Sequence, residues 1–290
     1  MRIVVTGAKG GTGRTIVRVL RDAGHQVIGV DIQPPTTGET HYVQLDLRDA
    51  GGVNDIVADA DGIVHFGSLP SDGWTSTTET FHNLMLGGFN ILQASRNAGV
   101  KRIVMASSIM VYGDMARQPS FPVLETSPLL PFSIYGGTKR WLEEVAMDYS
   151  RWHGLAIAAL RLGRIVYEGG YDWRLKPHVE SDGSAAPVLW TYVDARDVAT
   201  ACLAWLTSNR NGFEAYHIAA PNVCVATPTR ALVERFYPQM VAFADDLPEH
   251  GSPFSTKKIG DHLGWRALID WRELRREYEQ DVHVRRSSGT

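Results

Sequence analysis

Short apolar runs alternate with longer segments of mixed polarity along the chain, and this alternation predicts an α/β fold. The first run, Ile3–Val5, consists of β-branched residues without a polar position, which is typical of a strand buried on both faces of a parallel sheet. Further strands are expected at residues 25–30, 41–45, 61–66, 102–106 and 155–162. Because helical segments separate these runs, we expect a doubly wound parallel sheet.

The segments between the runs predict helices and two long loops. Helices are expected at residues 14–21, from Asp46 to about Ala58, at 81–98 and from Tyr135 to about 152. Much of the face of helix 81–98 is apolar, which predicts burial against the sheet and in a dimer. Residues 70–80 contain Gly, Pro and many polar side chains and are expected to form a loop that closes over a substrate. Residues 113–132 contain four prolines and are expected to leave no room for a helix.

Glycines cluster between the first strand and the first helix. Gly7, Gly10 and Gly13 permit a tight turn, a close approach of the backbone to a diphosphate, and close packing of helix on strand. The second strand ends on Asp31, where a carboxylate can accept hydrogen bonds from a ribose. This context predicts a dinucleotide site of the Rossmann type. The residues expected to bind the cofactor are Gly7, Gly10, Gly11, Thr12, Gly13, Asp31, Asp46, Leu47, Phe66, Gly67, Ser68, Tyr135 and Lys139.

Charge at Asp31 favours NAD over NADP, since the carboxylate repels a 2′-phosphate. Lys9 and Arg14 lie near enough in sequence to soften this preference. Asp46 is placed to contact the adenine amino group, and an N-cap of the following helix is the alternative role. His65, at the end of the fourth strand, is expected to be a structural histidine rather than a catalyst.

Candidate catalytic residues lie just after the fifth predicted strand and in the helix that begins at Tyr135. Tyr135 and Lys139 are four residues apart, so in a helix their side chains share one face. A nearby ammonium group lowers the pKa of a phenol, which makes Tyr135 a candidate general base. Ser108 lies at the carboxyl end of the fifth strand, the edge at which open parallel sheets bind ligands. We therefore expect Ser108 to hydrogen-bond the reacting oxygen while Tyr135 moves its proton.

Composition narrows the class of protein. The 290 residues are 44% hydrophobic and 21% charged, which is close to the globular average and excludes disordered and fibrous classes. The net charge of −3 provides no basic surface, so no nucleic acid or anionic membrane partner is expected. No apolar run is long enough for a membrane span. The two cysteines have no spacing typical of a disulfide or metal site, so no metal is expected and a cytoplasmic location is predicted.

These motifs together resemble the extended short-chain dehydrogenase/reductases, a family that includes sugar epimerases, dehydratases and dehydrogenases. The resemblance covers nearly the whole chain. Its motifs are the glycine cluster 6–13, Asp31, Asp46-Leu47, residues 107–113, Tyr135-x-x-x-Lys139, residues 190–199, which look like the return to the sheet, and residues 255–265. It implies that Ser108, Tyr135 and Lys139 are catalytic, with Lys139 also binding the nicotinamide ribose. The family's usual asparagine is replaced by Leu84, with Asn83 beside it, which puts its proton-relay role in doubt.

Two features that this chain lacks distinguish it from other subgroups of the family. Dehydratases of the family carry an acidic pair after the catalytic Ser or Thr, whereas Ile109 and Met110 follow Ser108 here and cannot transfer a proton. Only residues 165–189 lie between Arg164 and the predicted return strand, which is short for gripping a sugar nucleotide. The chain in this respect resembles small sugar-oxidising members such as uronate dehydrogenases. A uronate carboxylate would be bound by Arg174 first, or by Arg164, and a solvated loop charge is the alternative role of either arginine.

The sequence thus predicts an NAD-dependent oxidoreductase that acts on a hydroxyl of a small free sugar or sugar acid. We expect a Rossmann domain at residues 1–163 and 190–219, and a small substrate-binding subdomain at 164–189 and 220–290, in a homodimer. The tryptophans Trp74, Trp173 and Trp190 are candidates for stacking on a sugar or for core positions. One alternative is a nucleotide-sugar epimerase with tightly bound NAD, and another is a dinucleotide-binding sensor or scaffold without catalysis.

Overall fold

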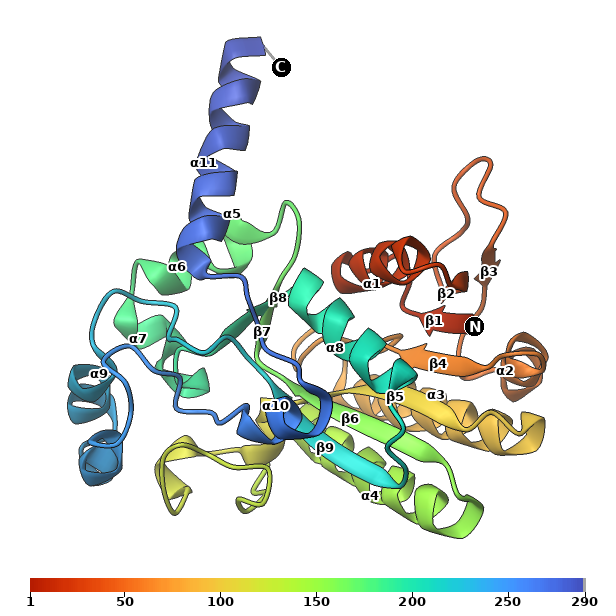
Figure 1. The fold of residues 1–290 in the computed structure, drawn as a ribbon, viewed down its shortest axis with the longest axis horizontal. Coiled ribbons are helices and arrows are strands. Elements are labelled where there is room, and N and C mark those ends of the chain that lie inside the picture. The colour runs from red at the N-terminus through yellow and green to blue at the C-terminus, as the bar shows by residue number, and fades with distance from the viewer. Residues whose placement is uncertain (289–290) are drawn as a thin grey trace.

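Seven parallel strands form the central sheet of the computed structural model, which describes the backbone of residues 1–288 and the side chains of residues 1–283 (Figure 1). The strand order is β3-β2-β1-β4-β5-β6-β9, with a reversal of direction of the connections at β1. These strands are β1 (Arg2–Thr6), β2 (Gln26–Asp31), β3 (Tyr42–Gln44), β4 (Gly62–His65), β5 (Arg102–Ser108), β6 (Ala156–Leu162) and β9 (Phe213–Ile218). The doubly wound parallel sheet predicted from the apolar runs is therefore confirmed.

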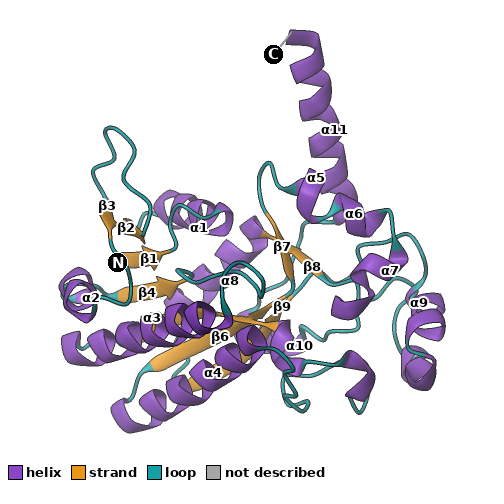
Figure 2. Ribbon diagram, turned by 180° about the vertical axis from the view of Figure 1, so that it is seen from behind, coloured by secondary structure: helices purple, strands orange, loops and turns teal. Residues whose placement is uncertain are grey.

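Two layers of helices cover the sheet (Figure 2). On one face α1 packs beside α8, and on the other α2, α3 and α4 lie side by side. The helices of these layers are α1 (Gly11–Asp22), α2 (Ala50–Val57), α3 (Thr77–Ala98), α4 (Ile134–His153) and α8 (Ala195–Thr207). Each buries an apolar stripe against the apolar residues of the strands, such as Ile3 of β1 and Val104 of β5, both without exposed surface.

A second, smaller layer of structure lies beyond the carboxyl ends of the strands. It contains a two-stranded parallel sheet, short helices and one long helix that projects from the body (Figure 1). The elements are β7 (Arg164–Val166), α5 (Tyr171–Arg174), α6 (Lys176–Val179), α7 (Asp182–Ala185), β8 (Tyr192–Asp194), α9 (Thr229–Phe236) and α11 (Trp271–Ser288). Helix α10 (Lys257–Leu263) instead packs against β9 of the central sheet. Single turns of 3₁₀ helix occur at Ile109–Tyr112, Met115–Arg117 and Ala186–Val188, and a longer one at Pro238–Ala244.

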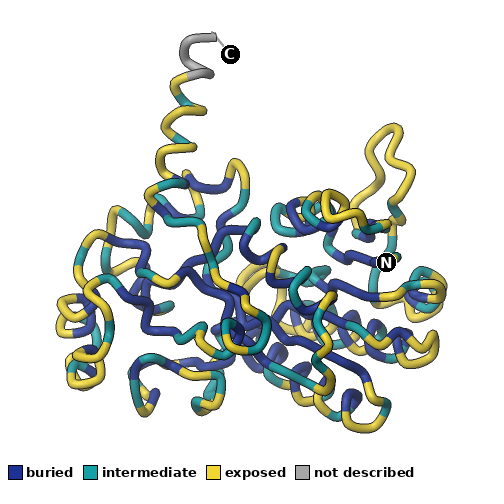
Figure 3. The backbone as a smooth tube through the Cα atoms, viewed as in Figure 1, coloured by how far each residue is buried: buried dark blue, intermediate teal, exposed yellow. Residues whose placement is uncertain are grey.

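Buried residues form three clusters, of which two lie against the faces of the central sheet. The third is centred on the smaller layer and draws on residues 109–123, 166–192 and 220–274. Figure 3 shows continuous burial along the inner strands, and the residues of α11 from Arg275 to His283 are mostly exposed. Segments far apart in sequence therefore share one apolar core above the sheet edge.

Several sequence-based boundaries are corrected by the structure. Residues 190–199 do not return to the central sheet, because β8 pairs with β7 and the returning strand is β9. Helix α2 begins at Ala50, and its N-cap is Asp49, whose carboxylate accepts the N–H groups of Gly51 and Gly52. The proline-rich segment 113–132 contains one helical turn, Met115–Arg117. Trp190 is fully buried, with its indole N–H donated to the Asp182 carbonyl, so it belongs to the core and cannot stack on a sugar.

Candidate active site

The glycine loop between β1 and α1 forms a tight cradle. Gly7 has a φ of +72°, and a Cβ there would lie 2.6 Å from the carbonyl oxygen of Phe66. A Cβ on Gly13 would overlap the Gly7 carbonyl, so the helix can approach the strand only with glycine at this position. Thr6 joins the ends of β1 and β4, since its Oγ1 accepts the Gly67 N–H at 2.9 Å. The backbone N–H groups at the start of α1 are thereby presented to an anion.

Asp31 lies beside this loop at the end of β2. Its Oδ2 accepts the Lys9 main-chain N–H at 2.9 Å, and its Oδ1 accepts the Gln33 N–H at 3.2 Å. Each carboxylate oxygen has a further lone pair for a ribose hydroxyl. The glycine cradle and this acceptor fit a dinucleotide, as the sequence predicts.

Asp46 and Leu47 lie on the far side of the cradle. Asp46 is not an N-cap: its carboxylate binds Arg48, with Nη2 at 2.6 Å, and this hydrogen bond lowers the pKa of Asp46. Its contact with an adenine amino group stays a prediction. The Leu47 side chain lies against Gly67, since a Cβ added at Gly67 would be only 2.7 Å from the Leu47 Cδ1 atom. Phe66, Gly67 and Ser68 follow β4 and stand at the same sheet edge.

Ser108, Tyr135 and Lys139 are brought together at the carboxyl edge of β5 by the start of α4. Ser133 caps α4 by accepting the Gly136 N–H at 3.2 Å, so Tyr135 lies in the first turn. The Lys139 Nζ donates to the Ala106 carbonyl at 2.8 Å and to Ser68 Oγ at 3.1 Å, and it lies 5.7 Å from the centre of the Tyr135 ring. All three side chains are buried. The expected grouping of the three residues is present.

The electrostatics of Tyr135 differ from the expectation. The pKa of the phenol is raised to about 12, chiefly by burial and also by the Asp72 carboxylate, whereas the hydrogen bond with Ser108 and the charge of Arg174 act to lower it. Burial also lowers the pKa of Lys139 to about 8, against the opposing charge of Glu143. Lys139 donates its hydrogen bonds to a main-chain and a hydroxyl oxygen. The lowering of the phenol pKa that the sequence predicts from Lys139 is not found in this state, in which desolvation dominates.

Two arginines of the smaller layer, Arg174 and Arg164, are the candidate ligands for a substrate carboxylate. Arg174, in α5, donates its Nε to the Ile165 carbonyl at 2.6 Å, and its guanidinium carbon lies 5.1 Å from the Tyr167 ring and 5.0 Å from the Trp173 ring. Arg164 begins β7, where burial and the charge of Arg174 lower its pKa. Among residues 1–283, whose side chains are described, neither guanidinium group has a carboxylate partner. The charge of Arg174 thus reaches the Tyr135 phenol and, among the described side chains, is not compensated by a carboxylate.

Further residues hold the site together, and of these Asp72 had no signal in the sequence. Asp72, in the loop after β4, accepts the main-chain N–H of Tyr135 at 3.1 Å. Asn83, which stands beside Leu84, accepts the Leu69 N–H at 2.9 Å and so holds the same loop, while Leu84 is buried. His65 is a structural histidine whose Nδ1 lies 2.9 Å from Thr6 Oγ1. Glu143 was predictable in principle, since it follows Lys139 by four residues on one helical face.

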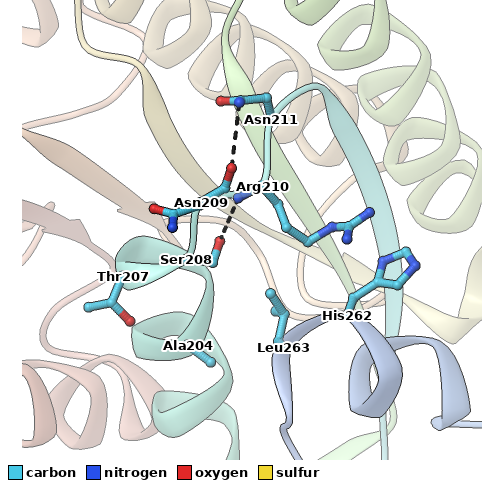
Figure 4. Close-up of a pocket in the computed structure, with 8 residues that line it drawn as sticks. All are labelled: Ala204, Thr207, Ser208, Asn209, Arg210, Asn211, His262 and Leu263. Carbon is cyan, nitrogen blue, oxygen red and sulfur yellow. Dashed lines mark hydrogen bonds between the residues drawn. The ribbon is translucent and has the colours of Figure 1, made fainter.

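A cavity of about 710 Å³ lies elsewhere, at the amino edge of the sheet (Figure 4). It is lined by the end of α8, the connection Ser208–Asn211, and His262 and Leu263 of α10. Since the glycine loop, Ser108 and Tyr135 all lie at the carboxyl edge, this cavity is separate from the candidate active site. Among the described residues, no cluster of His, Cys, Asp and Glu side chains has a metal-binding arrangement, and none of the helices is long and apolar enough to cross a membrane.

Curated proteins of two different activities are similar to this chain over about half its length. The chain is 32% identical over 169 residues to a uronate dehydrogenase of Pseudomonas syringae pv. tomato, covering 56% of this chain and 58% of that protein. It is 31% identical over 170 residues to a UDP-glucose 4-epimerase of Corynebacterium glutamicum, covering 56% of this chain and 50% of that protein. The matches therefore span only between half and three fifths of the length of these curated relatives.

Solved structures share the fold over the whole chain. A short-chain dehydrogenase/reductase superfamily protein from Agrobacterium tumefaciens with bound NAD has a TM-score of 0.77 at 23% identity and covers 100% of both chains. A glucuronic acid dehydrogenase from Chromohalobacter salexigens has a TM-score of 0.70 at 24% identity, covering 96% of this chain and 88% of that one. The sequence model of the NAD dependent epimerase/dehydratase family matches residues 3–219. This chain therefore belongs to the NAD dependent epimerase/dehydratase family, whose cofactor, NAD, fits the glycine cradle and Asp31.

Proposed function

We propose that this enzyme is an NAD-dependent dehydrogenase that oxidises a hydroxyl group of a small free sugar acid of the uronate class. The observation that carries the proposal is the pair of guanidinium groups on Arg164 and Arg174, which lack a carboxylate partner among the described side chains. The charge of Arg174 reaches Tyr135, since it lowers the pKa of that phenol. A substrate carboxylate bound by these arginines would hold its hydroxyl carbon beside the phenol.

The size of the smaller layer supports a free sugar. Residues 164–189 fold into β7, three short helices and one 3₁₀ turn, with little chain left to enclose a nucleotide. The two uronate dehydrogenases of Pseudomonas among the relatives, at 32% and 31% identity, support the same class of substrate. We accordingly assign substrate binding to residues 164–189 and 220–290, of which the last two lie outside the described residues.

The proposed chemistry uses the three grouped residues. Tyr135, as the phenolate, takes the proton of the substrate hydroxyl, and Ser108 donates a hydrogen bond to the same oxygen. NAD, when bound, supplies the hydride acceptor for the carbon that carries this hydroxyl and a positive charge that favours the phenolate. Lys139 keeps the end of β5 and Ser68 in place through its two hydrogen bonds. The carbon is left as a carbonyl, in a lactone or a ketone, and one proton is released.

The test is the near-ultraviolet absorbance of NADH after mixing the protein with NAD and matched uronates and aldoses. We expect NADH to accumulate with a uronate. Arg174→Gln should raise the KM for that uronate by about 100-fold, because a charge-assisted hydrogen-bonded pair is lost, and should change the KM for a neutral aldose little. Arg151→Gln is the matched control, since Arg151 is an exposed arginine paired with Asp148 near the far end of α4. An unchanged uronate KM in Arg174→Gln would overturn the assignment.

A second candidate function is nucleotide-sugar epimerisation with tightly bound NAD. The similarity to the UDP-glucose 4-epimerase of Corynebacterium glutamicum favours it at 31% identity. An epimerase returns the hydride to its substrate, so no NADH would accumulate with any sugar. NAD that copurifies with the protein, together with interconversion of UDP-sugars, would establish this function in place of the first.

The proposed enzyme is a homodimer through the outer surfaces of α3 and α4. Large apolar side chains are exposed there on two adjacent helices: Phe81, Leu86, Phe89, Trp141 and Met147. A second copy of the same surface would bury them, as in most closed homo-oligomers. Sedimentation should give twice the chain mass of 32.0 kDa. Leu86→Glu should produce monomers and Leu268→Glu, at a position 82% exposed outside these helices, should not.

Two buried, unpaired cysteines are consistent with the proposed cytoplasmic location.

A further inference from the structure

The loop between β2 and β3 folds back onto the glycine loop and holds one lysine there. The Lys9 ammonium forms an ion pair with Glu39, donates to Thr36 Oγ1 at 3.0 Å, and lies 4.6 Å from the centre of the Tyr42 ring. Thr36 reinforces the arrangement, since its N–H and its hydroxyl donate to the same Glu39 oxygen at 3.0 and 2.7 Å. The Lys9 side chain is only 15% exposed, although its head is an ammonium group.

This lysine stands beside the acceptor for the adenosine ribose. Its main-chain N–H binds Asp31 Oδ2 at 2.9 Å, so its side chain starts next to the carboxylate that would receive the ribose hydroxyls. A 2′-phosphate on that ribose would lie within reach of the ammonium group if the group were free. Lysine is a common phosphate ligand, and a charge-assisted hydrogen bond to phosphate is strong.

The charges around the ribose position are balanced only when Glu39 is counted. Asp31 and Glu39 are negative, while Lys9 and Arg14 are positive, and Arg14 Nη1 donates to the Lys9 carbonyl at 3.0 Å. Hydrogen bonds from Lys9 and Thr36 lower the pKa of Glu39 to about 2, so the carboxylate is ionised at neutral pH. Without Glu39, the charges of Asp31, Lys9 and Arg14 would sum to a net positive charge. A net positive charge attracts a phosphate.

We propose that Glu39 is a cofactor-specificity residue that keeps the Lys9 ammonium occupied and thereby denies a 2′-phosphate its cation. Asp31 repels the phosphate directly, whereas Glu39 removes the neighbouring group that would otherwise attract it. From the sequence alone, the charge of Lys9 is expected to weaken the preference for NAD over NADP. The ion pair with Glu39 reverses this interpretation, because the lysine is already bound. The proposal rests on the NAD site and not on the identity of the sugar.

The experiment measures the dissociation constants of NADH and NADPH by the fluorescence of the reduced nicotinamide. In Glu39→Gln the ratio of the NADPH constant to the NADH constant should fall by about 10-fold, the effect of one charge-assisted contact, while the NADH constant changes less than about twofold. Adding Lys9→Met to Glu39→Gln should restore the original ratio, since the gain depends on the freed ammonium. Asp59→Asn is the matched control, because it removes an exposed carboxylate that pairs with Arg2 at the opposite edge of the sheet.

Two outcomes would overturn the proposal. One is an unchanged ratio in Glu39→Gln with an unchanged thermal midpoint. The other is a lowered ratio that survives the addition of Lys9→Met, since the lysine would then not be the phosphate ligand. Both readouts are dissociation constants of the cofactors. A failure to oxidise any uronate would therefore contradict the proposed function without affecting the test of Glu39.

Discussion

Tyr135 is subject to opposing electrostatic influences from its burial and from three groups around it. Burial and the Asp72 carboxylate raise the pKa of the phenol, and Ser108 and Arg174 lower it, with a net rise to about 12. A phenol in this state is mostly protonated at neutral pH and transfers its proton only when a positive charge or a bound oxyanion-forming substrate favours the phenolate. The rate of oxidation should therefore rise with pH across the neutral range.

Tyr135→Phe tests the role of the phenol itself. Turnover should fall by at least about 10²-fold, because the proton acceptor is removed while the ring remains. The dissociation constant of NADH should change little, since the glycine loop and Asp31 are untouched. Steady-state rates and nicotinamide fluorescence measure the two quantities separately. Turnover that persists in the variant would show that another group takes the proton.

Asp72→Asn tests the influence of the loop on that phenol. The amide oxygen can still accept the Tyr135 N–H, but the negative charge that raises the pKa of Tyr135 is lost. A lower phenol pKa gives more phenolate at a given pH, so the acidic limb of the kcat profile should move to lower pH by about half a unit to one unit. A profile that stays in place would mean that Asp72 acts only by holding the loop.

At the scale of elements, a buried ion pair joins α4, which carries Tyr135 and Lys139, to β6, the strand beside β5. Glu143 of α4 and Arg161 of β6 are each 5% exposed, and Arg161 Nη2 lies 2.7 Å from Glu143 Oε2. Ser107 of β5 also donates to Glu143. Arg161 extends to Tyr112, whose hydroxyl it reaches at 2.6 Å. The pair fixes α4, β5 and β6 relative to one another next to Ser108 and Lys139.

Glu143→Ala should destabilise the fold by about 3 to 5 kcal/mol, because it leaves the Arg161 charge buried without its partner. Urea unfolding measures this change. Glu144→Ala, on the same helix, removes the half-exposed partner of Arg140 and should cost at most about 0.5 kcal/mol. Similar costs for both variants would show that the buried pair does not join these elements as described.

How far the sequence predicts these elements depends on whether the signal is local. Apolar runs, the glycine loop and the spacing of Tyr135 and Lys139 are contained in short segments, and the structure places them as expected. Residues 190–199 resembled a return to the sheet, but pairing between distant strands decides that position, and β8 pairs with β7. The contacts Asp72–Tyr135 and Glu39–Lys9 join residues 63 and 30 positions apart, which no periodicity reveals.

At the scale of the whole molecule, two buried histidines lie at junctions, one between strands of the central sheet and one between the sheet and the smaller layer. His65, in β4, lies 2.9 Å from Thr6 Oγ1 of β1. His217, in β9, lies 2.6 Å from the Tyr112 hydroxyl and 2.8 Å from the Ser255 carbonyl, at the junction with the core of the smaller layer. Burial lowers the pKa of both imidazoles to about 3. Both are therefore neutral in the folded chain over most of the acidic range.

This predicts a loss of stability in acid that begins at mild pH. The unfolded chain binds protons on both histidines below about pH 6.5, whereas the folded chain does not until about pH 3, so the free energy of unfolding falls as pH decreases between these values. Each histidine contributes about 1.4 kcal/mol per pH unit in that window. Urea midpoints at a series of pH values measure the slope, which His65→Asn should reduce. His41→Asn is the control, because this imidazole is exposed in the folded chain. An equal slope in His65→Asn and the parent chain would mean that the folded state protonates His65 without cost.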